Sequence, residues 1–330
     1  MENFSVFHNA CVHVMKSPLS LATSENRLAI LTFHRVLIEQ DKIISDHIDE
    51  AVFSWQMSLI AKHFNVMRLT EAVERLKTNS LPTRALCITF DDGYADNYSV
   101  ALPILKKMNL CATFFIATGF LNGGRMWNDT LIEAVRRVKG DSLDMRQLGL
   151  DVYDTTTDQA RRCTIYQLIK KLKYFQIDQR NDKIDEIKEF IGEALPNNLM
   201  MNDAQVKDLY DQGMDIGGHT VCHPILSRIS DKQAEEEIIT NKQVLEEIIG
   251  APLASFAYPN GQPDVDFKSR DMEIVKQAGY KHAVSTASGV AGKAADLYQL
   301  PRLDIWDRQP LKYALRLLMS YSKKTYEQIK

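Results

Sequence analysis

Short apolar runs alternate with longer segments of helical periodicity along most of the chain. Runs rich in β-branched and aromatic residues, bounded by polar or turn residues, predict strands at 27–33, 84–90, 112–117, 214–217, 254–258, 282–285 and 300–305. Apolar residues spaced three and four apart predict helices at 53–64, 70–76, 101–108, 231–249 and 272–278. Strands separated by helices favour a mostly parallel sheet, and so many units of this kind favour a distorted (β/α)7 barrel over an open sheet.

One region departs from this rhythm. Residues 125–205 contain no convincing strand but carry helix-like runs at 129–138, 164–172 and 182–194. We therefore expect a helical insertion between the third and fourth strands of an α/β barrel. Such an insertion can be a lid or a substrate-recognition subdomain, or it can be a structural elaboration without a part in the chemistry.

Both ends of the chain predict additions to the barrel domain, which we place at 27–309. Residues 1–26 are expected to form an N-terminal extension, and residues 310–330 an amphipathic helix flanked by lysines and arginines. The apolar stripe of this helix consists of Leu311, Ala314, Leu315, Leu318 and Tyr321. A helix of this kind can rest on an anionic membrane, although packing on its own domain is the more common arrangement.

Composition narrows the class of protein and its expected location. The net charge of −3 over 330 residues is spread along the chain and gives no reason to expect a nucleic-acid partner. Five cysteines without C-x-x-C spacing predict buried free thiols. The start of the chain lacks the basic segment and clean apolar core of a secretion signal, and no window approaches about 18 uninterrupted apolar residues. We therefore expect a cytoplasmic protein, at the inner face of the membrane if the C-terminal helix binds there.

Polar residues able to bind a metal or transfer protons follow four of the predicted strands. His34 follows the first strand, Asp91 and Asp92 follow the second, His219 follows the fourth, and Asn260 follows the fifth within Pro-Asn-Gly. The C-terminal ends of the strands in a parallel α/β barrel share one face, and that face carries the active site. Residues far apart in the sequence are therefore expected to converge.

A metal site is predicted from Asp92, His219 and His223. One carboxylate and two imidazoles can hold a divalent ion and leave positions open for water and substrate. A pair of histidines four residues apart is a weak signal alone, but this pair follows a strand and a Gly-Gly turn, and a DDG segment occurs elsewhere. Zinc is the expected ion, and cobalt, nickel, manganese or iron(II) also suit these ligands.

The remaining polar residues suggest an acid–base reaction. Asp91 is then free to act as a general base, although aspartates before glycine also serve in turns. His34 is the best-placed proton donor for a leaving amine. Arg302 can orient Asp91 through a charge-assisted bond, or it can be a surface arginine. Trp127 and Asp129 can line the mouth of the site, where an aromatic ring stacks on a sugar, but the start of a helix explains the same letters.

Three segments resemble one known family. Thr-Phe-Asp-Asp-Gly at 89–93, His-Thr-x-x-His at 219–223 and Phe-Ala-Tyr-Pro-Asn-Gly at 256–261 are similar to the motifs of polysaccharide deacetylases of the NodB-homology type, carbohydrate esterase family four. The resemblance runs from about residue 27 to residue 305, apart from the helical insertion. The first two motifs together are highly specific.

The resemblance implies a fold, an activity and several residue roles. The fold is a distorted barrel of about seven strands, and the activity removes N-acyl groups, usually acetyl, from amino sugars. Asp91 would be the base, and Asp92 with the two motif histidines would be the metal ligands. The backbone N–H of Asn260 would help stabilise the oxyanion, with Tyr258 and Trp127 beside the substrate, and Thr220 would brace the metal loop.

The sequence also departs from the family pattern. Ala257 stands where the third motif often has an arginine, and no histidine follows His282 to supply the usual late motif. Some bacterial members resemble a circularly permuted form with the acid histidine on the first strand, which Phe33-His34 fits. Arg302 can replace the missing arginine.

We therefore predict a metal-dependent hydrolase acting on an N-acylated amino sugar, either an oligosaccharide or a lipid- or nucleotide-linked precursor. Two alternatives remain. The same centre could remove a formyl group or cleave another non-peptide amide. The departures from the family pattern are also compatible with an inactive carbohydrate-binding homologue.

Overall fold

A computed structural model describes residues 25–322 and 326–329. The N-terminal extension predicted at 1–26 lies almost entirely outside these residues. Within them, seven strands pair in parallel in the order β1-β5-β6-β9-β10-β11-β12, and β4 (Asn65–Val66) adds to β5. The seven strands are β1 (Leu28–Phe33), β5 (Ala85–Phe90), β6 (Thr113–Ile116), β9 (Asp215–Gly218), β10 (Ser255–Ala257), β11 (His282–Ser288) and β12 (Leu300–Arg302).

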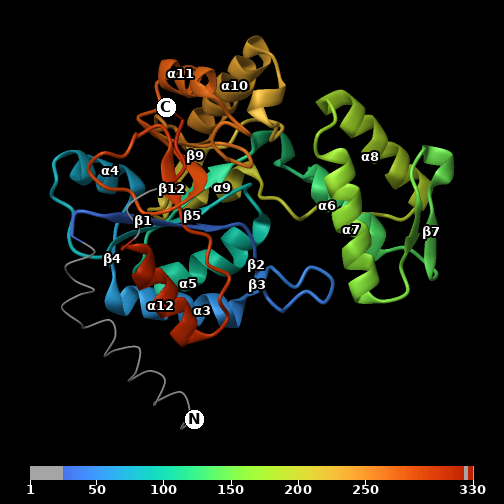
Figure 1. Ribbon diagram of the computed structural model, residues 1–330, viewed down its shortest axis with the longest axis horizontal. Helices are drawn as coiled ribbons and strands as arrows, with labels where there is room; N and C mark the ends of the chain where they lie inside the picture. Colours follow the sequence, from blue (N-terminus) through green and yellow to red (C-terminus); the bar gives the residue numbers. More distant parts are fainter. Residues whose placement is uncertain (1–24, 323–325, 330) are drawn as a thin grey trace, which may run out of the picture.

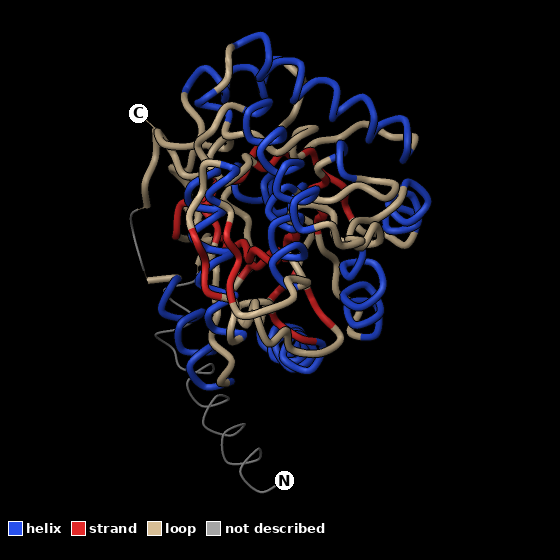
Figure 2. Tube along the Cα trace, turned by 90° about the vertical axis from the view of Figure 1, so that its right-hand side faces the viewer, coloured by secondary structure: helices blue, strands red, loops and turns tan. Residues whose placement is uncertain are grey.

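The sheet nearly closes on itself. Just beyond β12, Leu303 accepts a hydrogen bond from the N–H of Thr32 at 3.1 Å and donates one to the carbonyl of Ile30 at 2.7 Å, so the last strand continues onto β1. Pairing between β9 and β10 is reduced to Phe256 opposite Gly218. The result is a distorted, nearly closed parallel barrel with flanking helices, which confirms the predicted fold class (Figures 1 and 2).

Side chains alternate between the interior of the barrel and its helix-covered outer surface. Ile30, Cys87 and Phe115 belong to an interior cluster that also contains the buried face of α4 (Leu69–Lys77). Their neighbours Leu31 and Ile88 belong to the larger cluster beneath the outer helices. Because side chains alternate along a strand, the residues that continue the interior set past the strand ends point into the mouth of the barrel.

The other helices surround the barrel, and Figure 2 shows the red strands inside the blue helices. They are α3 (Glu50–His63), α5 (Leu102–Lys107) after a π-helical turn (Asn97–Ala101), α9 (Asp203–Asp211), α10 (Asp231–Ile249), α11 (Ser269–Gln277) and α12 (Pro310–Ser320). Helix α10 has the predicted bounds, because Ser230 and Gln233 form a capping box at its start and Gly250, at φ 72°, ends it. Helix α9 was not predicted, although Asn202 and Gln205 form a capping box there as well.

Residues 127–191 form a separate lobe beside the barrel, here called the insertion (Figure 1). It contains α6 (Trp127–Arg136), β7 (Ser142–Asp144), β8 (Val152–Asp154), α7 (Asp158–Leu172) and α8 (Ile177–Ile191) around its own apolar core. The expectation that this region holds no strand was wrong, because β7 and β8 pair as an antiparallel hairpin. Each strand has one buried side chain, Leu143 or Tyr153, which is too short a pattern to recognise.

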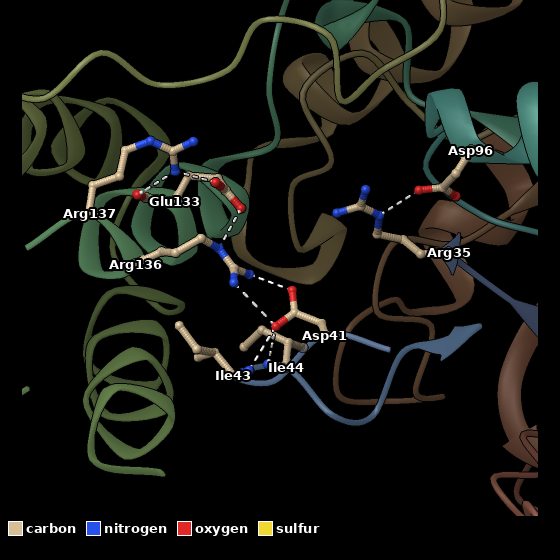
Figure 3. A network of polar contacts seen from close by, with 8 residues as sticks. All are labelled: Arg35, Asp41, Ile43, Ile44, Asp96, Glu133, Arg136 and Arg137. Atoms are coloured by element: carbon tan, nitrogen blue, oxygen red, sulfur yellow. Dashed lines mark hydrogen bonds and ion pairs between the residues drawn. The ribbon is translucent and has the colours of Figure 1, made fainter. Parts of the chain in front are cut away.

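The insertion is tied to the loop between β2 (Val36–Leu37) and β3 (Ile48–Asp49). Asp41 in this loop accepts hydrogen bonds from the N–H groups of Ile43 and Ile44 at 2.8 and 2.9 Å and pairs with Arg136 of α6 (Figure 3). The side chains of Ile43 and Ile44 are buried in the apolar core of the insertion. This loop therefore holds the insertion against the barrel.

The C-terminal helix is shorter than the predicted span 310–330, because α12 ends at Ser320. Its apolar stripe faces the protein: Ala314, Leu318 and Tyr321 are buried, and Tyr313 packs edge-on against Trp55 of α3 with ring centroids 5.4 Å apart. Most of the stripe is therefore covered by the protein, with Leu311 and Leu315 half-buried, and the suggested membrane contact is not supported. No described helix is long and apolar enough to cross a bilayer.

The described cysteines are free thiols, but they are not all buried as expected. Cys87 is buried in the barrel, whereas Cys111 and Cys222 are half-buried and Cys163 is exposed. Cys11 lies outside the described residues.

Candidate active site

The C-terminal ends of the strands surround a cavity that brings together most of the predicted site residues. His34 follows β1, Asp91 and Asp92 follow β5, and His219 follows β9. The residues lining the cavity are His34, Asp91, Asp92, Met126, Trp127, Asn128, Ile169, Lys173, Arg180, His219, His223, Ile225, Tyr258, Asn260 and Thr286.

Asp92, His219 and His223 form a set that fits a metal ion. The Nε2 atoms of both histidines lie 3.5 Å from Oδ1 of Asp92, and that buried oxygen has no hydrogen-bond partner within the described structure. Ligand atoms about 2.0–2.1 Å from a tetrahedral ion are about 3.4 Å apart, so these separations fit one ion held between the three groups. A buried carboxylate oxygen without a partner is costly, and a cation would satisfy it.

The two histidines present the nitrogen lone pairs that a metal requires. Nδ1 of His219 lies 2.7 Å from the carbonyl oxygen of Ala257, so Nδ1 carries the proton and Nε2 is free to coordinate. Burial lowers the pKa of His223 to about 4, which keeps its imidazole neutral. Burial alone would raise the pKa of Asp92, but the adjacent imidazoles of His219 and His223 hold it below its ordinary value. Asp92 and His223 therefore favour their metal-binding forms, whereas the carboxylates of Asp92 and Asp91 outweigh burial and raise the pKa of His219.

The backbone at the site is strained. Asp92, Thr220, His223 and Asn260 have φ angles of 75°, 66°, 50° and 58°. This left-handed conformation is unfavourable for most residues, and above all for a β-branched threonine. The hydroxyl of Thr220 accepts a hydrogen bond from the N–H of His223 at 3.1 Å, which holds the loop in this shape.

Asp91 and Arg302 form a buried ion pair. Both point into the barrel mouth, since they continue the interior sets of β5 and β12. The guanidinium donates to both carboxylate oxygens of Asp91 at 2.7 Å, and Nε donates to the carbonyl of Ser285 at 3.0 Å. Burial raises the pKa of Asp91, but the charges of Arg302 and His219 outweigh it and hold that pKa below its ordinary value. Arg302 therefore keeps the carboxylate ionised and fixes its orientation.

His34 lies in a turn that is fastened to the start of the π-helical turn. Asn97 donates to the carbonyl of His34 at 2.7 Å, and Asp96 accepts from the N–H of Val36 at 3.0 Å. Asp96 also pairs with Arg35 at 2.8 Å (Figure 3). These contacts fix the backbone that carries His34, whose side chain lines the same cavity as the metal set.

Trp127 and Asp129 were both predicted to line the mouth of the site, but only one of them does. Trp127 lines the cavity at the start of α6. Asp129 does not line the cavity, because the residue is only 2% exposed and is buried within the protein. Burial raises the pKa of Asp129 to about 7, against the opposing charge of Arg35 and a hydrogen bond from Tyr94. The expectation that Asp129 lines the mouth was therefore wrong, because the first turn of α6 directs it into the protein.

The walls near the third motif come from β10 and β11. Tyr258 stacks on Phe267 with centroids 3.8 Å apart, and its hydroxyl donates to the carbonyl of Tyr298 at 2.9 Å. The carbonyl of Asn260 accepts from the hydroxyl of Thr286 at 2.8 Å. No described residue accepts a hydrogen bond from the N–H of Asn260, which leaves this donor at the cavity wall.

Sequence reasoning missed two residues of α10 that support the metal loop. Asn241 accepts from the N–H of His219 at 3.1 Å and donates to the carbonyls of Ile116 and Thr220. Glu237 accepts from the N–H groups of the two residues before His223, each at 2.8 Å. The sequence held one signal for Asn241: it is a polar residue among the apolar positions of an amphipathic helix. Such a residue is expected to be buried and hydrogen-bonded, and Asn241 is fully buried.

The two glycines before His219 end strand β9 and do not form the expected turn, and this packing requires Gly218. A Cβ at Gly218 would lie 2.1 Å from the Tyr280 hydroxyl and 2.7 Å from Oδ1 of Asn241. Only a glycine lets Asn241 approach the loop this closely.

The fold and the site define a class of protein: a parallel α/β barrel with an Asp/His/His set and a second acid at the carboxyl ends of its strands. The family model described as polysaccharide deacetylase matches residues 78–283, which is more than half of the chain. The chain belongs to this family, whose members are hydrolases that act on carbon–nitrogen bonds.

Individual relatives are distant. The Bacillus subtilis protein YxkH, which bears the name of a polysaccharide deacetylase, is 20% identical over 280 residues, or 84% of this chain and 71% of that protein. Poly-beta-1,6-N-acetyl-D-glucosamine N-deacetylase of Staphylococcus aureus is 29% identical over 154 residues, or 43% of this chain and 51% of that enzyme. The chain thus matches about half the length of the staphylococcal enzyme.

Solved structures show the same fold. The Streptococcus pyogenes deacetylase PplD, in complex with acetate, has a TM-score of 0.59 at 21% identity, covering 89% of this chain and 98% of that one. The likeness extends over nearly the whole of both chains and therefore includes the barrel.

Proposed function

We propose that this protein is a metal-dependent hydrolase that removes an N-acetyl group from an amino sugar of a glycan or glycan precursor. The observation that carries the proposal is the cavity in which a buried acid, Asp91, lies beside the Asp92, His219 and His223 set. Membership of the polysaccharide deacetylase family supports the reaction class. The name of the staphylococcal relative, an N-acetylglucosamine polymer deacetylase, supports acetyl as the acyl group.

Asp92, His219 and His223 would hold the ion, and zinc is the expected one. When bound, a divalent ion supplies a Lewis acid for the acyl oxygen and lowers the pKa of a water. The same ligands accept cobalt, nickel, manganese and iron(II), so the choice of ion depends on supply as well as affinity.

Residues of the chain itself perform the proton transfers. Asp91, held by Arg302, takes a proton from the attacking water. The N–H of Asn260 donates to the oxygen that becomes negative as the carbonyl is attacked. His34 gives a proton to the sugar nitrogen as the C–N bond breaks. The products are acetate and a free amine. Trp127 offers ring surface for the sugar, whereas the ring of Tyr258 is fully buried against Phe267 and supports the wall of the cavity.

Removal of the metal should abolish hydrolysis and destabilise the fold. We expect chelated protein to release no acetate from short N-acetylglucosamine oligomers and zinc to restore release. Zinc at about 100 times its Kd should raise the free energy of unfolding by about 2.7 kcal/mol, because the ion binds only the folded protein. Acetate assays and urea unfolding with and without zinc measure the two effects.

The matched control for this experiment is His223→Gln. This variant should lose both the activity and the zinc-dependent gain in stability. Zinc-dependent stabilisation without turnover on any N-acetyl sugar would contradict the hydrolase and favour a carbohydrate-binding protein.

A second prediction concerns His34. His34→Gln should lower kcat on an N-acetyl amino sugar by about 100-fold or more, because the amine leaves poorly without a proton. On 4-nitrophenyl acetate, whose leaving group needs no proton, the same variant should stay within about tenfold of the parent enzyme. Parallel kcat measurements on both substrates check this expectation. Equal losses on both would remove His34 from the acid role.

A further inference from the structure

The cavity that holds the candidate centre has a second end, formed by the insertion. Ile169 and Lys173 come from α7 and its C-terminal cap, Arg180 comes from α8, and Trp127 comes from α6. These residues line the same cavity as Asp91 and the metal set. A substrate bound at the centre therefore meets the insertion.

Arg180 is a buried cation without an anionic partner. The residue is 4% exposed, and its guanidinium lies over the ring of Trp127 at 4.8 Å from the centroid. Nε is buried without a hydrogen-bond partner, and no carboxylate of the described residues forms an ion pair with the guanidinium. Two groups, the Cys222 thiol and the Glu237 carboxylate, act on it electrostatically, and that carboxylate is already bound by two backbone N–H groups. Buried charges are normally paired, so an unpaired guanidinium at a cavity wall indicates a ligand anion.

Lys173 adds a second positive charge at the same end. Its side chain is half-buried, its amino group lies 5.7 Å from the ring of Tyr174, and no described carboxylate lies within ion-pair distance. Asp266 acts on it electrostatically from farther away. The acids that line the cavity, Asp91 and Asp92, belong to the candidate metal centre and not to the insertion, and Arg302 pairs with Asp91 there. The insertion end is therefore positively charged.

We propose that the insertion selects substrates carrying an oxyanion, a phosphate or a carboxylate, next to the N-acetyl amino sugar. This inference rests on the proposed deacetylase function and narrows its substrate class to acidic amino sugars. Arg180 would bind two oxygens of the anion through its planar fork, which the ring of Trp127 keeps in one orientation. Lys173 would contribute a charge without fixed direction.

The test compares three substrates: a neutral N-acetylglucosamine trimer, N-acetylglucosamine 1-phosphate, and an oligosaccharide alternating N-acetylglucosamine with glucuronate. The zinc-loaded parent enzyme should have a higher kcat/KM on at least one acidic substrate than on the neutral trimer. The acidic substrate that is preferred shows whether the site binds phosphate or carboxylate. In Arg180→Gln the ratio of acidic to neutral kcat/KM should fall by about 10- to 100-fold, mainly through KM, since a charge-assisted hydrogen bond is lost.

Arg228→Gln is the matched control. Arg228 is an exposed arginine that stacks on Tyr174 at 5.1 Å and does not line the cavity, so removing the same charge there should leave the ratio within about twofold. Equal losses on neutral and acidic substrates in Arg180→Gln would overturn the proposal, because a packing role for Arg180 predicts that result. A parent enzyme without preference for either acidic substrate would overturn it too.

A binding experiment separates this inference from the proposed function. Calorimetry on metal-free protein compares N-acetylglucosamine 1-phosphate and glucuronate-containing oligosaccharide with neutral N-acetylglucosamine. We expect at least one acidic ligand to bind about tenfold more tightly, and Arg180→Gln to lose the difference. If no substrate is hydrolysed but this preference holds, the deacetylase proposal fails and the anion site stands. If the trimer is hydrolysed and no acidic ligand binds more tightly than the neutral one, the deacetylase proposal stands and the anion site fails.

Discussion

Asp91→Asn is expected to lower kcat for deacetylation by about 100- to 10,000-fold while the metal remains bound. The amide has nearly the shape of the carboxylate but cannot take a proton from water. Asp92, His219 and His223 are unchanged in this variant, so zinc content should stay near that of the parent protein. Because the lost interaction acts in the transition state, KM should change little. Steady-state kinetics and metal analysis of the purified variant measure both quantities.

The control for Asp91→Asn is Asp215→Asn. Asp215, at the start of β9, also pairs with an arginine, Arg68, but at the opposite end of the barrel. The control variant should retain the parent kcat, which separates loss of a base from loss of an Asp–Arg pair. Retention of more than a tenth of the parent kcat by Asp91→Asn would mean that another group removes the proton.

Arg302→Met should cause a loss of stability as well as activity. The substitution leaves the carboxylate of Asp91 buried, since only 4% of its side chain is exposed, with no cation to balance it. Removing one partner of a buried ion pair costs about 3–5 kcal/mol of unfolding free energy, because the remaining charge cannot return to water. Activity should fall with it, because nothing then orients Asp91. Urea unfolding measures the loss in free energy.

Two further variants show that this loss comes from the pair. The double variant Asp91→Asn with Arg302→Met should lose less stability than the sum of the two single changes, since it leaves no unpaired charge. Arg68→Met removes a cation whose side chain is 43% exposed, and it should cost less than about 1 kcal/mol. An Arg302→Met variant as stable as Arg68→Met would show that the pair is not important for folding.

Most of the barrel could be read from local patterns. Every predicted barrel strand exists in the structure, with ends displaced by a few residues, because strand ends depend on the pairing partner. The hairpin β7–β8 and helix α9 escaped recognition: the strands are three residues long, and α9 was hidden next to a segment already assigned to the insertion. Short elements carry too few apolar positions to show a period.

Some residues of the candidate site could likewise be predicted from the sequence, and others could not. Asp92, His219 and His223 were identifiable because two of them are close in sequence and each set follows a strand. Asn241 supports the loop from within a helix, and nothing in its local sequence connects it to His219. Asp129 was misplaced because the phase of α6, and not the sequence around it, determines which side chains face the cavity.

By itself, the sequence determined the barrel of alternating strands and helices, the acid pair and the histidine pair, because periodicity and motif spacing are local properties of a chain. Only the tertiary structure decided that Arg302 pairs with Asp91, 211 positions away, and that Arg180 of the insertion lines the same cavity. Those contacts depend on closure of the barrel and on packing of the insertion against it, and no local pattern encodes either one.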